Sequence, residues 1–167
     1  MTHRAGWSEA DDSTRDRIVR VSRSYRSTPK AAFDAWTNPA SLEKWFGPPG
    51  FRAEVLVHEL RVGGAWRFRM IADDGSGYHH FGTFLEISPP RRLAFTWASE
   101  EQVDGWRDTG GNPTTVTVDF EEGDAGVTVV ITHRDLASEE TRRSLTHGWD
   151  GSLVCLADSL ERPESAG

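Results

Sequence analysis

The first periodic segment of the chain begins near residue 18 and alternates as a half-buried strand does. Val19, Val21 and Tyr25 alternate with polar residues, and only Arg23 interrupts the apolar side. An alternation of apolar and polar residues is typical of a β-strand with one face toward the core and the other toward solvent. The sequence therefore predicts a first strand up to about residue 25.

Two short helices are predicted directly after this strand. Ser27 or Thr28 can cap the first helix, with Pro29 at its first position. Asn38 stands before a proline, and a residue in that position avoids the helical region, so the first helix ends there. A second helix is expected over 39–45, and the glycines and prolines that follow it form a turn.

Strand patterns then recur along most of the remaining chain. The separators are short and rich in Gly, Pro, Asp and Asn, which favours hairpins and therefore antiparallel pairing. The predicted strands cover residues 51–58, 65–72, 78–87, 93–98, 114–121 and 126–133.

The last predicted element is a long helix over 138–160. Its apolar residues recur every three or four positions, which places them in one stripe. Two glycines, Gly148 and Gly151, flank the tryptophan of this stripe, and we expect another group to approach the helix closely there. The stripe consists of Leu145, Trp149, Leu153, Leu156 and Leu160.

This order of elements predicts an α+β fold of one domain. A curved seven-stranded antiparallel sheet would wrap around the long C-terminal helix, with the two short helices after the first strand. The length of 167 residues suits a single domain over 18–161. Residues 1–17 are charged and aperiodic, so we expect a disordered or loosely packed tail, and a flexible C-terminus over 162–167.

The composition excludes several classes of protein. A formal net charge of -7 argues against a binder of nucleic-acid backbones. No apolar run is long enough to insert into a membrane, and the N-terminus has no secretory signal. A single cysteine excludes a disulfide framework, so a cytoplasmic location is expected. Seventeen of the 19 basic residues are arginine, a bias that we attribute to the source genome, which we expect to be bacterial.

Chemistry-bearing motifs are few. No H-E-x-x-H, G-x-S-x-G, Rossmann or P-loop pattern occurs, so no metal and no cofactor is predicted. His79 and His80 are adjacent on one strand and point to opposite faces, and the sequence does not decide which one faces inward. His133 and Glu86 are candidates for polar groups at the core or its rim. A hydrogen-bonded core histidine and a rim salt bridge are the commoner roles for such residues.

Several segments resemble the START-like helix-grip (SRPBCC) superfamily, in its branch of homologues of the activator of the heat-shock protein 90 ATPase. The matches follow in one order over residues 17–160. They are A-F-D-A-W-T-N-P-A-S-L-E-K-W-F-G-P (32–48), G-G-A-W-R-F-R-M (63–70), G-T-F-L-E-I-S-P-P-R-R-L-A-F-T-W (82–97), V-T-V-D-F (116–120), V-T-V-V-I-T-H-R-D-L (127–136) and G-W-D-G-S-L-V-C-L (148–156).

The resemblance implies a deep apolar cavity between the sheet and the C-terminal helix. Related domains bind lipids, hormones or polyketide intermediates there, and the branch has no universal catalytic motif, so no catalytic residue is assigned. The seven tryptophans of the chain agree with an aromatic pocket. The expected lining is Trp36, Trp45, Phe46, Trp66, Phe68, Met70, His80, Phe84, Phe95, Trp97, Val118, Trp149 and Leu153, with Glu86 and His133 as polar groups.

Three functions are compatible with this cavity. The first is binding of a small hydrophobic or aromatic ligand, such as a lipid or a polyketide-like molecule. The second is a cyclase or aromatase that uses an inward His or Glu. The third is a co-chaperone that activates an ATPase, which is disfavoured because the chain lacks the separate N-terminal domain of the eukaryotic activators. A homodimer through the edge strands is compatible with the pattern, but nothing specifies it.

Overall fold

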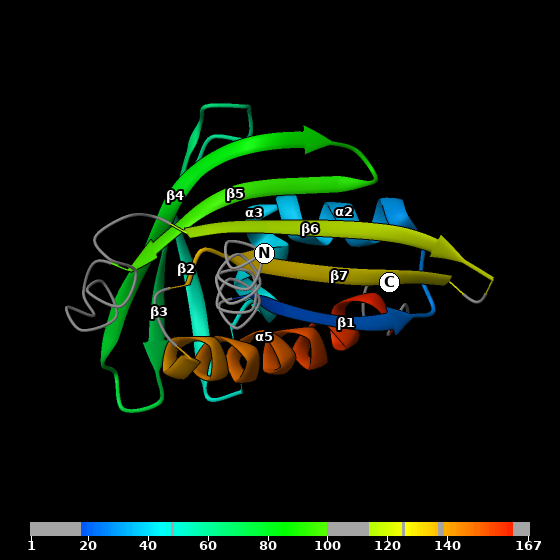
Figure 1. Ribbon diagram of the computed structural model, residues 1–167. Helices are drawn as coiled ribbons and strands as arrows, with labels where there is room; N and C mark the ends of the chain where they lie inside the picture. Colours follow the sequence, from blue (N-terminus) through cyan, green and yellow to red (C-terminus); the bar gives the residue numbers. More distant parts are fainter. Residues whose placement is uncertain (1–17, 48, 100–113, 125, 137–138, 162–167) are drawn as a thin grey trace, which may run out of the picture.

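The computed structural model describes residues 18–47, 49–99, 114–124, 126–136 and 139–161, shown in Figure 1. The predicted tails over 1–17 and 162–167 lie outside these residues. Seven strands and three helices are described, in the predicted order. They are β1 (Val19–Tyr25), α2 (Pro29–Thr37), α3 (Pro39–Trp45), β2 (Phe51–His58), β3 (Ala65–Ala72), β4 (Gly77–Ser88), β5 (Arg92–Ser99), β6 (Thr114–Gly123), β7 (Gly126–Arg134) and α5 (Glu139–Leu160).

The two short helices begin at side-chain caps. The hydroxyl of Thr28 accepts a hydrogen bond from the backbone N–H of Ala31 at the start of α2. The side chain of Asn38 accepts from the N–H groups of Ala40 and Ser41 at the start of α3. Each cap satisfies N–H groups that have no partner inside the helix, and each helix has proline at its first position. Both helices therefore begin and end where the sequence predicts.

The sheet has the strand order β1-β7-β6-β5-β4-β3-β2, and every neighbouring pair is antiparallel. It curls strongly, so that β2, β3 and β4 turn across the direction of the other strands (Figure 1). Helix α2 packs on β6 and β7, α3 packs on β2, and α5 packs beside β1 and against both short helices. The predicted α+β helix-grip architecture is therefore confirmed.

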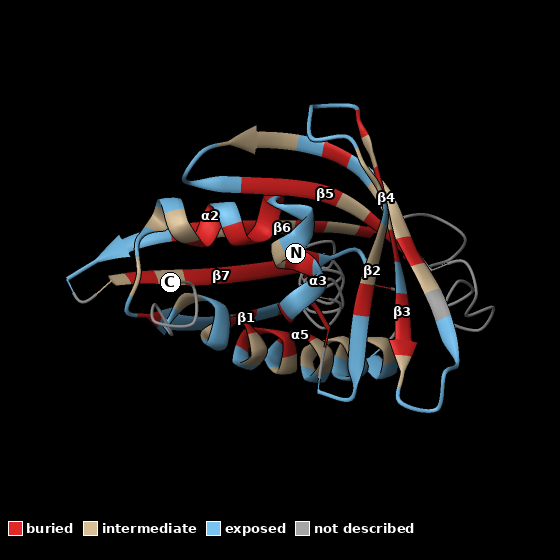
Figure 2. Cartoon of the chain, turned by 180° about the vertical axis from the view of Figure 1, so that it is seen from behind, coloured by how far each residue is buried: buried red, intermediate tan, exposed pale blue. Residues whose placement is uncertain are grey.

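Alternating strand residues form the core on the concave side, where Figure 2 shows buried segments facing the helices. Val116, Val118 and Phe120 of β6 are buried at 2% exposure or less, and the residues between them are partly exposed. The middle of the α5 stripe is also buried, with Leu153 and Leu156 at 1% and 0% exposure. This burial of one face of β6 and of α5 is what the sequence pattern predicts.

Two irregularities change which side chains face the core. The pairing of β4 with β5 shifts between Phe84 and Glu86, and the pairing of β2 with β3 shifts between Val55 and Val57. An extra residue in one strand reverses the inward and outward positions beyond it. Neither irregularity is predicted from the alternation of the sequence, and both affect residues at the site.

Among the described helices, none combines the length and the apolar character that a crossing of the bilayer requires.

Candidate functional site

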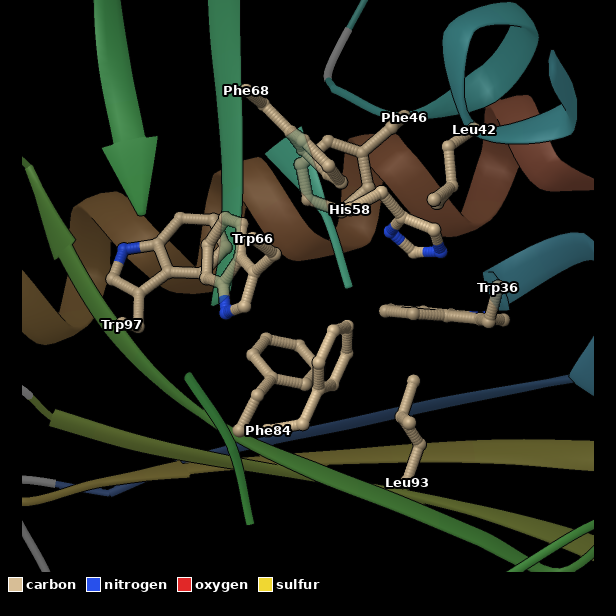
Figure 3. A pocket seen from close by; sticks show the side chains of 10 residues that line it. Trp36, Leu42, Phe46, His58, Trp66, Phe68, Phe84, Leu93 and Trp97 are labelled. Carbon is tan, nitrogen blue, oxygen red and sulfur yellow. The ribbon is translucent and has the colours of Figure 1, made fainter. Parts of the chain in front are cut away.

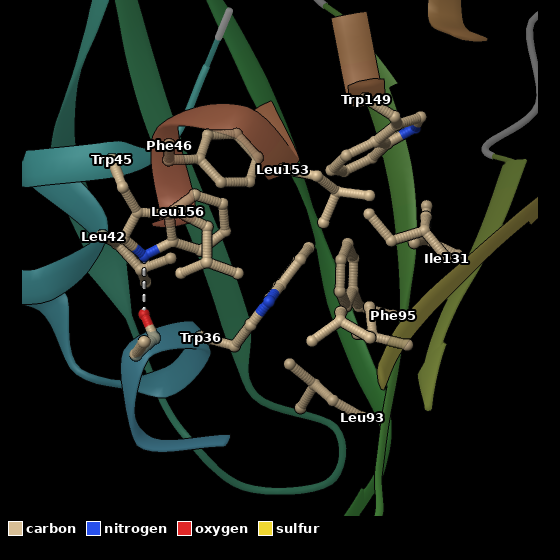
Figure 4. Packing of buried hydrophobic residues seen from close by; sticks show 14 of the residues in the cluster. Trp36, Leu42, Trp45, Phe46, Leu93, Phe95, Ile131, Trp149, Leu153 and Leu156 are labelled. Atoms are coloured by element: carbon tan, nitrogen blue, oxygen red, sulfur yellow. Dashed lines mark hydrogen bonds between the residues drawn. The ribbon is translucent and has the colours of Figure 1, made fainter. Parts of the chain in front are cut away.

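Aromatic rings from the helices α2, α3 and α5 and from the strands β3, β4, β5 and β6 meet on the concave side of the sheet. The ring of Trp36 on α2 stacks on that of Trp149 on α5, with centroids 6.0 Å apart and planes at 28°. Trp149 in turn lies 5.1 Å from Trp97 of β5, and Trp36 lies 4.9 Å from Trp45 of α3. Figure 4 shows Trp36 at the centre of this packing. A continuous network of rings in contact therefore extends through the interior between the sheet and the helices.

A small space remains inside this ring network, which we call the inner chamber. Its volume is about 20 Å³, which suits a group of the size of one water molecule. Nine of its ten lining residues are buried, and only His58 is partly exposed (Figure 3). The lining consists of Trp36, Leu42, Phe46, His58, Trp66, Phe68, Phe84, Leu93, Phe95 and Trp97.

A larger space, which we call the outer pocket, lies between α5 and the strands β3, β4 and β5. Its volume is about 250 Å³, just below the usual range for sites of small molecules. The turn after α3 closes one side. The lining consists of Phe46, Gly47, Phe51, Met70, His80, Trp97, Ser144, Leu145, His147, Gly148, Trp149 and Ser152.

Phe46 and Trp97 belong to both linings, so their rings separate the inner chamber from the outer pocket. The two ring centroids are 6.2 Å apart. Phe46 is positioned by the end of α3, where Gly47 has a φ of +106° that favours glycine, and a Cβ there would lie 2.7 Å from the Cε of Met70. The N–H of Gly47 also donates to the hydroxyl of Ser152, 3.2 Å away, which ties this turn to α5.

The predicted lining residues divide into three groups. Seven line the inner chamber and five line the outer pocket, with Phe46 and Trp97 counted in both. Trp45, Val118 and Leu153 are buried in the core but line neither space. The indole N–H of Trp45 donates to the backbone carbonyl of Ala35, 2.9 Å away, so this residue holds the two short helices together.

His80 is the inward member of the adjacent histidine pair. It is 8% exposed, and its ring lies 4.2 Å from that of Trp97, at the wall of the outer pocket. Burial lowers its pKa to about 3, and a backbone hydrogen bond at Ala98 opposes this shift only in part. His79 faces the other side of the sheet, where its Nδ1 accepts a hydrogen bond from the Nε of Arg67 at 2.8 Å. His80 is therefore a neutral ring near pH 7.

His133 is fully buried and both of its ring nitrogens have partners. The indole N–H of Trp149 donates to Nδ1 at 3.1 Å, and Nε2 lies 2.6 Å from the hydroxyl of Thr114. That hydroxyl donates to the carbonyl of Trp97, so it accepts from Nε2–H and the ring is the neutral Nε2–H tautomer. Burial, together with the charge of His80, lowers the pKa of His133 to about 3. This histidine therefore joins β6, β7 and α5 and has no free nitrogen for a ligand.

Glu86 lies outside both spaces. The shifted register of β4 places Ile87 against the core in its stead, and the Glu86 side chain is 44% exposed. Its carboxylate accepts a hydrogen bond from the Ser88 hydroxyl at 2.9 Å and lies 4.0 Å from the guanidinium of Arg92. The carboxylate has the rim environment that is common for strand acids, away from the rings.

The sequence analysis missed His58 and, apart from Trp149, the residues of α5 that line the outer pocket. The irregularity between Val55 and Val57 turns His58 toward the inner chamber, and no sequence signal predicts it. Ser144 and His147 are polar residues beside the apolar stripe of α5. From the sequence alone, polar residues at such positions are expected to face solvent. Within the described residues, no cluster of three or more His, Cys, Asp or Glu is placed to hold a metal ion.

The sequence predicts that another group approaches the helix closely at Gly148, and the structure does not show this. A Cβ built on this residue would have no atom of another described element within 4 Å, so no group in the described part of the chain lies against the helix there. The space beside Gly148 belongs to the outer pocket.

Three bacterial proteins of solved structure resemble the chain. One from Chromobacterium violaceum is 27% identical, with a TM-score of 0.75, and the match covers 86% of this chain and 97% of that one. The AHSA1 protein from Silicibacter pomeroyi is 25% identical, with a TM-score of 0.73 and coverage of 85% and 96%. A protein from Arthrobacter aurescens, 23% identical with a TM-score of 0.78 and coverage of 90% and 89%, shares the fold.

Among curated proteins, none gives a significant sequence match. A sequence model of one family, described as activator of Hsp90 ATPase homolog 1-like protein, matches residues 26–161. The match spans most of the chain, including every helix that the structure describes. The chain therefore belongs to the activator of Hsp90 ATPase homolog 1-like family.

Proposed function

We propose that this protein binds a small hydrophobic or aromatic molecule in the outer pocket. Folds of this family commonly bind hydrophobic ligands. A fold does not fix a function, so the proposal depends on the site itself. The observation that carries it is a pocket of about 250 Å³ whose wall includes the rings of Phe46, Trp97 and Trp149.

The chemistry of the wall favours an uncharged aromatic ligand. Aromatic faces offer a large contact area, and rings prefer offset or edge-to-face packing against one another. A few polar groups, among them Ser144, His147 and Ser152, lie on the α5 side of the same pocket. This combination of an apolar wall with few polar groups is typical of small-molecule sites.

The cyclase alternative has less support from the geometry. Of its three candidate residues, only His80 reaches a pocket, while Glu86 faces outward and both nitrogens of His133 are engaged. A pKa of about 3 leaves His80 far from the neutral range in which a general acid or base is effective. We also propose a cytoplasmic location, which agrees with the free thiol of Cys155.

Gly148 allows a direct test of the outer pocket. Because no atom of another described element lies within 4 Å of its Cβ position, a large side chain at residue 148 can enter the pocket without a clash with the described residues beside the helix. Gly148→Phe fills the space, whereas Gly148→Ala adds a single methyl group and improves helix propensity by about 1 kcal/mol. The two variants therefore separate loss of pocket volume from changes in the helix.

The probe for this test is 2-naphthol, with its affinity measured by isothermal titration calorimetry. We expect the affinity of Gly148→Ala for 2-naphthol to stay within about twofold of that of the unmodified protein. The affinity of Gly148→Phe should fall at least about tenfold, because the new ring occupies the space in which the ligand would bury its aromatic surface. Circular dichroism at the same temperature verifies that both variants are folded. Equal binding by Gly148→Phe, or no binding by the unmodified protein, contradicts the proposal.

A further inference from the structure

Three buried polar atoms around the inner chamber have no hydrogen-bond partner among the described residues. They are the indole nitrogens of Trp36 and Trp66 and the Nδ1 of His58. All three residues line the inner chamber, and Figure 3 shows them around the same central space. Buried polar groups in folded proteins are nearly always paired, so three such atoms at one small space indicate a site for a polar group.

The two described tryptophans that do not line the inner chamber, Trp45 and Trp149, both have paired indole nitrogens. The indole N–H of Trp45 donates to the carbonyl of Ala35, and that of Trp149 donates to His133. Trp36 and Trp66, by contrast, are each 3% exposed and offer a donor without a partner. Among the described residues, the buried indole nitrogens without a partner therefore both belong to the lining of the inner chamber.

His58 contributes an acceptor to the same space. Its Nε2 lies 2.6 Å from the backbone carbonyl of Thr37, and a carbonyl can only accept, so Nε2 carries the hydrogen. With one ring hydrogen, placed on Nε2, the other nitrogen Nδ1 is an acceptor, and this is the atom that lacks a partner. The inner chamber thus offers two donors and one acceptor within an aromatic wall.

We propose that the inner chamber recognises a neutral hydroxyl group on a ligand whose aromatic body lies in the outer pocket. A hydroxyl oxygen can accept from the indole N–H groups of Trp36 and Trp66, and its hydrogen can be donated to Nδ1 of His58. The volume of about 20 Å³ accommodates one group of this size. A charged head group is disfavoured, because no Lys, Arg, Asp or Glu lines the chamber.

The two spaces are adjacent across Phe46 and Trp97, whose rings belong to both linings. A ligand in the outer pocket reaches the inner chamber by moving one of these rings aside. The inference rests on the proposed function, since it assigns a chemical class to the ligand of the same pocket.

Three naphthalenes that differ at one position test this assignment. Naphthalene has no polar group, 2-methoxynaphthalene can only accept, and 2-naphthol can both accept and donate. We expect 2-naphthol to bind about tenfold more tightly than naphthalene, because its hydroxyl gives hydrogen-bond partners to buried groups that otherwise lack them. The methyl ether, which cannot donate, should bind more weakly than 2-naphthol. Affinities come from isothermal titration calorimetry of the full chain.

Trp66→Phe removes one unpaired donor and keeps an aromatic ring in the wall. The matched control is Trp45→Phe, which changes the same ring at a position outside both pockets. We expect Trp66→Phe to lower the preference for 2-naphthol over naphthalene by threefold or more, and Trp45→Phe to leave that preference unchanged. His58→Phe is a second variant, which abolishes the preference for 2-naphthol over its methyl ether.

The outcomes distinguish the inference from the proposed function. If naphthalene and 2-naphthol bind equally well, the outer pocket binds aromatic molecules but the inner chamber does not recognise a hydroxyl, and the inference is overturned. Retention of the full preference in both Trp66→Phe and His58→Phe overturns it as well. If neither compound binds, the proposed function and the inference fall together.

Discussion

Acid destabilises this protein through its two buried histidines. His80 and His133 both have a pKa lowered to about 3, from an ordinary value of 6.5, chiefly because burial penalises the charged ring. The folded state therefore keeps both rings neutral at a pH at which the unfolded chain protonates them. Stability from these groups is fully present above pH 6.5 and is lost as the pH falls below it.

The expected loss is large compared with the stability of a domain. Between pH 7.5 and pH 5 each histidine removes about 2 kcal/mol, since each pH unit below the unfolded pKa costs about 1.4 kcal/mol. The two together remove about 4 kcal/mol, against a typical total of about 5–15 kcal/mol. Above pH 5 the carboxylates of Asp74 and Glu139, whose pKa values are lowered by hydrogen bonds, contribute little to this loss.

Urea unfolding followed by tryptophan fluorescence, at pH values from 7.5 to 5, measures this loss. His80→Phe is the informative variant, because a phenyl ring can keep the contact with Trp97, 4.2 Å away, and cannot be protonated. We expect its loss of unfolding free energy over this range to fall to about 2 kcal/mol. A loss below about 1 kcal/mol in the unmodified protein, or the same loss in His80→Phe, would refute the reasoning.

Two further predictions concern α5. Leu156→Ala removes a side chain that is 0% exposed, and we expect a loss of about 2–5 kcal/mol in urea unfolding at pH 7.5, whereas Val154→Ala, at a position 50% exposed, serves as the control and loses much less. Tyr25→Phe removes a hydroxyl that donates to the carbonyl of Leu153 at 2.6 Å and joins β1 to α5, so we expect a loss of about 1–3 kcal/mol, and an unchanged unfolding free energy would contradict the importance of this bond.

Local sequence patterns were sufficient for the elements and their order. The caps at Thr28 and Asn38 act on backbone groups within three residues, so the bounds of α2 and α3 follow from the sequence alone. Strand alternation depends on a period of two, and the buried Val116, Val118 and Phe120 follow it. The stripe of α5 was predicted in the same way, because its period of 3.6 is a property of the helix.

The site depended on features that local patterns do not contain. The register shift in β4 turned Glu86 outward, and the one in β2 turned His58 inward, because an extra residue in one strand is defined only by the strand that it pairs with. The pairing of Trp149 with His133, 16 residues away, likewise required the helix to be placed on the sheet.

The sequence by itself determined the fold class, the buried faces of β6 and α5 and the abundance of aromatic rings. Only the tertiary structure decided that these rings pack into one network and leave two spaces, of about 20 and 250 Å³, on either side of Phe46 and Trp97. It also decided which indole nitrogens found partners. The physical reason is that period and propensity act over a few residues, whereas the shape of a pocket results from side chains that meet from different elements.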